Sequence, residues 1–253
     1  MRLFQYWDSG EPPDEVAGWI DGFRVRNPDF KHMLLNRDSA SWFIGKHLGA
    51  RERRAFEQLL VPSMQSDYLR TCALLRFGGV YADADLQCLR PLAGLIERAP
   101  RTFLLVFDHH IANGLLAVRR PDDAYLRACF EFATRNIELR RFADMSPRFL
   151  AAHAVAGPDV YTGICRLVDP SPPGEDPLSL APPAPAVARA LQAEVEVTPE
   201  LREAVLGCTR THVFSAAPWI GTEQPAYKQT ERHWMKWPGA IYSDEGSERL
   251  VAP

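Results

Sequence analysis

A pair of glycines marks the point where a predicted helix passes directly into a predicted strand. Apolar residues recur at helical spacing after Ser66, which is a candidate N-cap for that helix. Gly78 and Gly79 end the helix, because glycine alone adopts left-handed backbone angles without strain. A strand is predicted from Val80. Such a junction is expected where helices and strands belong to one α/β unit.

Strands and helices alternate along the rest of the chain. Short apolar runs predict strands, and amphipathic runs opened by a proline or a capping side chain predict helices. The predicted strands cover residues 3–7, 30–35, 102–107 and 115–118, and the predicted helical segments cover residues 14–23, 39–59 and 122–141. Ser39 is the expected cap of the second helical segment, and Gly49 is its expected break. The pattern predicts one α/β domain, which at 253 residues can fold without a disulfide or a structural metal.

Composition excludes several classes of protein. A net charge of -3 and an isoelectric point near 6.2 supply no general field for nucleic acid, so no nucleic-acid partner is expected. No apolar run approaches the roughly 20 residues that span a bilayer, and residues 1–7 lack the apolar core of a signal peptide, so we expect a cytoplasmic protein. The five cysteines are scattered and odd in number, which favours buried apolar thiols. Residues 170–185 hold seven of the 21 prolines and predict an extended surface loop.

Two aspartates follow the predicted strand. In an extended segment Asp83 and Asp85 point to one side, where they can offer hard oxygen ligands to one divalent cation such as Mn²⁺ or Mg²⁺. Diphosphate oxygens or waters would complete the ligand set. The bare D-x-D pattern also arises by chance in solvated loops. Asp67 and Arg70 share one helix face, either as an ion pair within the helix or as groups that face a bound nucleotide.

A longer ordered pattern surrounds these residues. The runs Ser66 to Arg70, Phe77 to Asp85 and Arg90 to Leu92 resemble the signature of the D-x-D sugar-binding glycosyltransferases. These are the family 32 enzymes and their relatives, including yeast α-mannosyltransferases, capsular polysaccharide sugar transferases and, more distantly, the clostridial glucosylating toxins. Further stretches are similar to family elements: the opening strand that ends at Trp7, the segment around Asn113, the element around Gly157, and a terminal motif that contains His233, Trp234 and Trp237.

The resemblance implies a GT-A fold, a Rossmann-like nucleotide-binding sandwich with a central mixed, mostly parallel sheet. It implies one domain over residues 1–253, with a segment at about 212–240 that closes over a nucleotide-sugar donor. The donor would contact residues on several elements, namely Trp7, Tyr81, Asn113, Gly157 and either Trp234 or Trp237. The implied catalytic residues are Asp67, Arg70, Asp83 and Asp85, and the implied metal ligands are Asp83, Asp85 and His233.

The activity that the resemblance implies is metal-dependent transfer of a sugar, with retention of configuration, from a nucleotide diphosphate. The acceptor would be a glycan or a lipid-linked saccharide. The sequence leaves open whether the protein also contacts the inner face of the membrane. The leaving phosphate would itself accept the acceptor proton. Asp108, His109 and His110 are candidates for an acid or base, although they are better explained as solvated loop residues.

Three alternatives remain open from the sequence. A nucleotidyltransferase or phosphohydrolase would also use paired carboxylates on a phosphate-bound metal. A non-catalytic relative would keep the fold and bind a sugar nucleotide without turnover. A toxin-like transferase would perform the same chemistry on a protein acceptor.

Overall fold

The computed structural model describes residues 1–8, 10–97, 100–146, 148–170, 178–221, 223–229 and 239–243. Its elements follow one another as β1 (Arg2–Tyr6), α1 (Asp14–Arg26), β2 (Lys31–Leu35), α2 (Arg37–His47), α3 (Ala50–Gln58), α4 (Pro62–Phe77), β3 (Gly79–Ala82), β4 (Gln87–Cys88), α5 (Ala93–Ile96), β5 (Thr102–Phe107), β6 (His110–Val118), α6 (Ala124–Glu138), α7 (Arg148–Val155), α8 (Pro158–Val168), α9 (Pro185–Glu194), α10 (Pro199–Leu206), β7 (Thr209–His212), η1 (Val213–Ala216), β8 (Ile220–Gly221) and η2 (Ala226–Gln229).

Six strands form the central sheet in the order β2-β1-β3-β6-β5-β7. β1 pairs in parallel with β2 and β3, and β5 pairs in parallel with β7, whereas β6 is antiparallel to both of its neighbours. Five of the six strands therefore run in one direction. The predicted α/β architecture with a mixed, mostly parallel sheet is confirmed.

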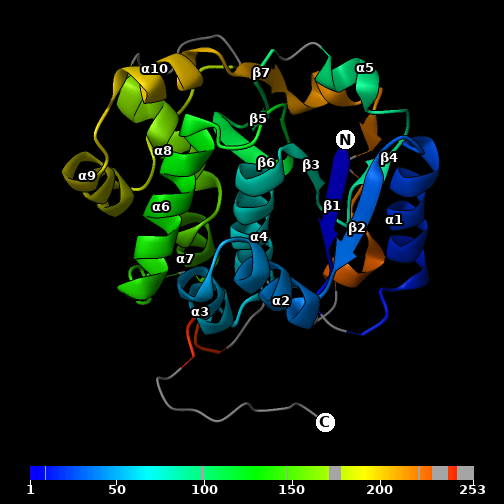
Figure 1. The fold of residues 1–253 in the computed structure, drawn as a ribbon, viewed down its shortest axis with the longest axis horizontal. Coiled ribbons are helices and arrows are strands. Elements are labelled where there is room, and N and C mark those ends of the chain that lie inside the picture. Colours follow the sequence, from blue (N-terminus) through cyan, green and yellow to red (C-terminus); the bar gives the residue numbers. More distant parts are fainter. Residues whose placement is uncertain are drawn as a thin grey trace.

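Apolar residues cover both faces of this sheet, as the alternation of side chains along a strand requires. In β3, Tyr81 joins the larger core, which the helices α2, α3, α4, α6 and α8 cover. Its neighbours Val80 and Ala82 join the smaller core on the other face, with Phe23 of α1 and Leu95 of α5. Figure 1 shows α4 in the middle of the molecule, α6 and α8 on one side of it and α1 on the other.

Helix α4 is the most enclosed helix of the larger core. Every residue from Met64 to Leu75 is buried, including the polar Asp67 and Arg70. The predicted cap at Ser66 is wrong, because α4 begins one turn earlier, at Pro62, with Val61 in the cap position. A proline at the first helical position loses no backbone hydrogen bond and therefore favours this earlier start.

Two other boundaries also differ from the predictions. Asn36, not Ser39, caps α2, and the two residues form a reciprocal capping box in which Ser39 Oγ accepts from the Asn36 amide. The break at Gly49 is confirmed, since it separates α2 from α3. The strand predicted over 115–118 is longer and begins at His110.

The described residues bear on three further predictions, which concern the cysteines, membrane-spanning helices and the proline-rich stretch. All five cysteines are free, and four of them are buried, which agrees with apolar thiols. No helix in the described part of the chain is long and apolar enough to cross a membrane. Of the proline-rich stretch, residues 171–177 lie outside the described part, and Pro185 begins α9.

Candidate functional site

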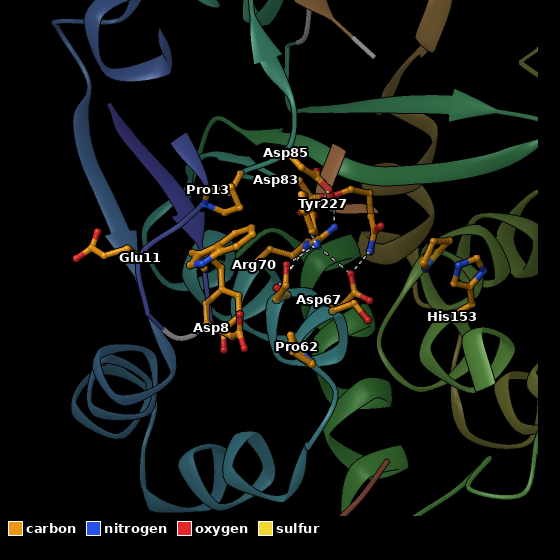
Figure 2. Close-up of a pocket in the computed structure, with 17 residues that line it drawn as sticks. Asp8, Glu11, Pro13, Pro62, Asp67, Arg70, Asp83, Asp85, His153 and Tyr227 are labelled. Atoms are coloured by element: carbon orange, nitrogen blue, oxygen red, sulfur yellow. Dashed lines mark hydrogen bonds and ion pairs between the residues drawn. The ribbon is translucent and has the colours of Figure 1, made fainter. Parts of the chain in front are cut away.

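A cavity of about 470 Å³ opens where β1 and β3 end and α4 begins. Seventeen residues line it: Tyr6, Trp7, Asp8, Glu11, Pro13, Pro62, Ser63, Ser66, Asp67, Arg70, Asp83, Ala84, Asp85, Asn113, His153, Pro158 and Tyr227. Figure 2 shows Asp8 and Glu11 at one side of the cavity and His153 at the other, with Arg70 and Asp67 between them. Ligands of open α/β sheets bind at such carboxyl ends of parallel strands.

Gly79 allows the chain to bring Asp83 to this edge. Its φ of +104° is a backbone conformation that side chains rarely adopt, and a Cβ atom there would lie 2.5 Å from the carbonyl oxygen of Arg2 in the neighbouring strand. Gly78 has a φ of +61° and closes α4 just before it. The glycine pair therefore ends the helix and also permits the close approach of β3 to β1.

Arg70 is the centre of the polar network in the cavity. Its Nη2 lies 2.8 Å from Asp83 Oδ1 and 3.0 Å from Asp67 Oδ1, and it also donates to Ser66 Oγ at 2.7 Å. Nη1 donates to the carbonyl oxygen of Asn113 at 2.5 Å. Both Asp67 and Arg70 are almost fully buried, so this is more than a surface ion pair on one helix face. Breaking a buried, hydrogen-bonded pair of this kind is costly.

A bulge in β6 supplies the Asn113 carbonyl. Leu104 pairs with Leu116 and the next residue, Leu105, pairs with Ala112, so the pairing to β5 skips residues 113–115. Such bulges redirect the chain locally. Asn113 thereby donates its side-chain Nδ2 to Asp67 Oδ1 at 2.9 Å.

Two glycines leave room beside the carboxylates. A Cβ atom on Gly114 would lie 2.7 Å from Asp83 Oδ2, and one on Gly157 would lie 2.9 Å from Asp67 Oδ2. Neither glycine has a positive φ, so it is the close approach that requires the absence of a side chain there. Gly157 thus lies next to Asp67, although it does not itself line the cavity.

Asp85 contacts residues from much later in the chain. Its Oδ2 accepts a hydrogen bond from the hydroxyl of Tyr227 at 2.9 Å and lies 2.8 Å from Nζ of Lys228. The Tyr227 ring also meets Trp7 edge to face, with 5.4 Å between ring centres. Trp7 and Tyr227 pack against the small apolar cluster of Val16, Ile20 and Ala84.

The buried carboxyl groups have shifted pKa values. Burial raises the pKa of Asp83 to about 7, the charge of Arg70 opposes this rise, and Asp85 adds to it. Burial likewise raises the pKa of Asp67, against the opposing charges of Arg70 and His153. For Arg70, burial alone would lower the pKa, but Asp83 and Asp67 outweigh it and raise the pKa above its ordinary value. A cation bound between Asp83 and Asp85 would favour their ionised forms.

The donor set fits a divalent cation. Asp83 and Asp85 present hard carboxylate oxygens to one cavity, and the absent side chain of Gly114 leaves space at Asp83 Oδ2. No group of three or more His, Cys, Asp or Glu side chains that could hold a metal occurs among the described residues. Oxygens from a ligand or from water would therefore have to complete the coordination.

Most of the residues singled out from the sequence come together here. Trp7, Asp67, Arg70, Asp83, Asp85 and Asn113 all line the cavity. Tyr81 lies beneath it: the residue is fully buried, its hydroxyl pairs with Ser66 Oγ at 2.6 Å, and its ring packs 4.5 Å from Cζ of Arg70. Its contact with a donor remains a prediction. His233, Trp234 and Trp237 lie outside the described residues.

Asp108 and His109 form the turn between β5 and β6, with φ of 47° and 60°. Neither they nor His110 line the cavity. The interpretation as loop residues agrees with the turn at Asp108 and His109, but it is wrong for His110, which is the first residue of β6 and pairs with Phe107. His109 Nδ1 instead lies 3.0 Å from the carbonyl oxygen of Ser179.

Several lining residues were not found from the sequence. His153 and Tyr227 line the cavity, and Lys228 pairs with Asp85 beside it. Tyr227 and Lys228 lie within the segment at about 212–240 that was expected to close over a donor, although neither residue was singled out. Asp8 and Glu11 lie in the breaker-rich loop after β1. Asp8 and Glu11 could have been found from the position of their loop at the end of a strand, because functional residues often lie in such loops.

Part of the chain that forms this cavity is similar in sequence to known proteins. Residues 13–102 match the model of the glycosyltransferase sugar-binding region containing the DXD motif, so the predicted resemblance is confirmed for this stretch. HOC1 of Saccharomyces cerevisiae, named as a glycosyltransferase, is 27% identical over 96 residues, or 37% of this chain and 24% of that protein. The initiation-specific alpha-1,6-mannosyltransferase of Schizosaccharomyces pombe is 24% identical over 101 residues, or 38% of this chain and 26% of that protein. The matches thus span about a quarter of each yeast protein.

A solved structure extends the comparison to the fold. PaToxG glycosyltransferase superposes on 96% of this chain and 88% of its own with a TM-score of 0.50, at 14% sequence identity. The shared architecture therefore continues through β5, β6 and the later helices, beyond the stretch that the family model matches.

Proposed function

We propose that this protein is a metal-dependent glycosyltransferase that moves a sugar from a nucleoside diphosphate to a glycan or lipid-linked saccharide, with retention of configuration. The observation that carries the proposal is the meeting of two sets of groups in one cavity. Asp83 and Asp85 offer ligands for a phosphate-bound cation, and the neighbouring Asp67, Arg70 and Asn113 offer charged and polar contacts for a sugar.

The donor would lie along the cavity. Its base would meet Trp7, whose indole borders the cavity beside Tyr227, and its diphosphate would lie at Asp83 and Asp85. The sugar would face Asp67 and Arg70. A buried carboxylate and an amide side chain are suited to sugar hydroxyls, because each accepts or donates hydrogen bonds in a fixed direction.

Asp83 and Asp85 would hold Mn²⁺ or Mg²⁺, and the predicted third ligand is His233, which lies outside the described residues. When bound, the cation would act as a Lewis acid that stabilises the charge developing on the leaving diphosphate. Arg70 is fixed by Ser66, Asn113 and the two carboxylates, so its positive charge is preorganised beside the same leaving group.

Asp67, Asp83 and Asp85 are poorly suited to act as a general base. Asp67 and Asp83 are both paired with Arg70, and Asp85 is paired with Lys228. Burial raises the pKa of Asp67 and of Asp83, but a bound cation would favour the ionised forms and would take up oxygens of Asp83 and Asp85. The proposal therefore assigns the acceptor proton to the leaving phosphate, as the resemblance implies.

The first test is release of nucleoside diphosphate from a panel of UDP-, GDP- and ADP-sugars, with Mn²⁺, Mg²⁺ or EDTA. We expect metal-dependent release of one diphosphate, and a loss of about 100-fold or more in Asp85→Asn. Asp21→Asn is the matched control, because Asp21 is an exposed helix residue paired with Arg24. Release of pyrophosphate or inorganic phosphate would indicate a nucleotidyltransferase or phosphohydrolase instead. Donor binding without release, with acceptor saccharides present, would indicate a non-catalytic relative.

A further inference from the structure

Asp83 and Asp85 are each paired with a positively charged side chain of the protein, which we call the two internal cations. Asp83 Oδ1 lies 2.8 Å from Nη2 of Arg70, and Asp85 Oδ2 lies 2.8 Å from Nζ of Lys228. Two neighbouring carboxylates repel each other unless positive charge is close to both. The two internal cations therefore supply the positive charge that the pair requires.

The two internal cations are held very differently. Arg70 is 3% exposed, lies in the middle of a buried helix and makes four further contacts, with Ser66, Asp67 and Asn113. The side chain of Lys228 is 21% exposed and lies in a short 3-10 turn, next to Tyr227, which lines the cavity. Of the two, Lys228 is the one that can leave its carboxylate without unfolding a core element.

The segment Glu223–Gln229 is attached independently of Lys228. Glu223 Oε2 accepts from Nε2 of Gln87 at 3.0 Å, and the Ala226 amide donates to Glu15 Oε2 at 3.0 Å. The Tyr227 ring packs on Trp7. These contacts keep the ammonium of Lys228 tethered close to Asp85, at a high effective concentration, even when the pair between them is broken.

We propose that Lys228 is an internal counter-ion that occupies Asp85 in the metal-free protein, and that a divalent cation must displace it to bind. This inference rests on the proposed function, because it concerns the same metal site. A metal ion can bind only to the fraction of the protein in which the pair between Lys228 and Asp85 is broken, so the pair lowers the apparent metal affinity by that fraction. Lys228 is thus a positioning residue that keeps Asp85 in place between turnovers and lowers the affinity for metal.

The test is a titration of nucleotide-free protein with Mn²⁺, in which free Mn²⁺ is followed by electron paramagnetic resonance. Lys228→Met removes the charge and keeps most of the stem, and we expect it to bind Mn²⁺ about threefold to tenfold more tightly than wild type. Lys228→Arg keeps the charge and should remain within about twofold of wild type. Lys46→Met is the matched control, because Lys46 lies over Trp42 on α2 and does not line the cavity.

Thermal unfolding supplies a second measurement. Lys228→Met should unfold at a lower temperature than wild type without metal and gain more from saturating Mn²⁺, because metal then replaces the missing counter-ion. An unchanged or weakened Mn²⁺ affinity in Lys228→Met, while Asp85→Asn still abolishes binding, would overturn the role of Lys228 and leave the proposed function standing. Wild-type Mn²⁺ affinity in Asp85→Asn would instead overturn the metal site itself, and the counter-ion role with it.

Discussion

Arg70 and Asp83 join the middle of α4 to the residue that follows β3, with 2.8 Å between Nη2 and Oδ1. The same guanidinium nitrogen also holds Asp67. The network is therefore part of the core packing as well as part of the cavity, and changes to it should affect both stability and activity.

Replacement of Arg70 by Met should destabilise the protein by about 3–5 kcal/mol, because Asp67 and Asp83 would lose their shared buried counter-ion. Chemical denaturation measures this loss, and turnover should disappear as well. Arg24→Met is the control: Arg24 forms an exposed pair with Asp21, so its change should stay below about 1 kcal/mol. Equal losses in the two variants would contradict a structural role for the network.

Gly114→Ala should impair donor binding more than stability. The added Cβ would lie 2.7 Å from Asp83 Oδ2 and would force that carboxylate to move, whereas the backbone of Gly114 has no positive φ to strain. We expect at least about a tenfold loss of metal-dependent turnover, with an unfolding free energy within about 1 kcal/mol of wild type. Gly18→Ala, on an exposed part of α1 with no atom within 4 Å of the new Cβ, should leave turnover unchanged. Full activity in Gly114→Ala would show that the position of Asp83 is not critical.

Trp7→Leu should weaken binding of the nucleoside diphosphate about tenfold, because stacking of a base on an aromatic ring contributes roughly 1–3 kcal/mol. Isothermal titration calorimetry with metal present measures the dissociation constant. Trp42 provides the control, since its side chain on α2 is 59% exposed and lies outside the cavity. If Trp7→Leu and Trp42→Leu bind nucleotide equally well, Trp7 does not contact the base, and its role is limited to packing against Val16, Ile20 and Ala84.

Glu194 gives a pH-dependent contribution to stability away from the cavity. Its carboxylate accepts from Nη1 of Arg141 at 2.9 Å, and this hydrogen bond, together with the charges of Arg141 and Arg135, lowers its pKa. A lowered folded-state pKa stabilises the protein above the ordinary pKa of about 4.5, and this stabilisation disappears as the pH falls through the folded-state value. Glu194→Gln should therefore cost about 0.5–1 kcal/mol at pH 7, and this cost should decrease steadily as the pH falls from 4.5 to 3, as measured by urea denaturation. A constant difference across this range would contradict the ion pair.

The sequence predicted those strand and helix boundaries that depend on the conformational preferences of neighbouring residues. The strand over 102–107 was predicted with the observed bounds, because its apolar run is bounded on both sides by polar residues. Gly78 and Gly79 marked the end of α4 for the same reason: their backbone conformation excludes most other residues. The long ordered motif also predicted that Asp67, Arg70, Asp83 and Asp85 share one site, and the separate stretch around Asn113 was expected to reach the same site; all five residues line the cavity.

Contacts between distant segments could not be predicted in the same way. Tyr227 and Lys228 reach Asp85 across more than 140 residues; the resemblance indicated that their segment approaches the donor, but not which of its side chains contact Asp85. Asn113 and Gly114 are usual turn residues, yet they lie within β6, because the bulge against β5 accommodates them. Helix capping by Ser66 failed as a prediction since its hydroxyl is occupied by Tyr81 and Arg70, which are tertiary partners.

The position of β3 in the sheet shows why the stretch that matches the family model depends on the rest of the chain. β3 lies between β1 and β6, and both of these strands fall outside residues 13–102. A fragment cut at those bounds would carry Asp83 directly after a strand whose two edges both lack their neighbouring strands, and it would lack Asn113. We therefore expect that residues 13–102 do not fold on their own. Recombination or truncation would preserve the motif only if β1 and β6 were kept with it.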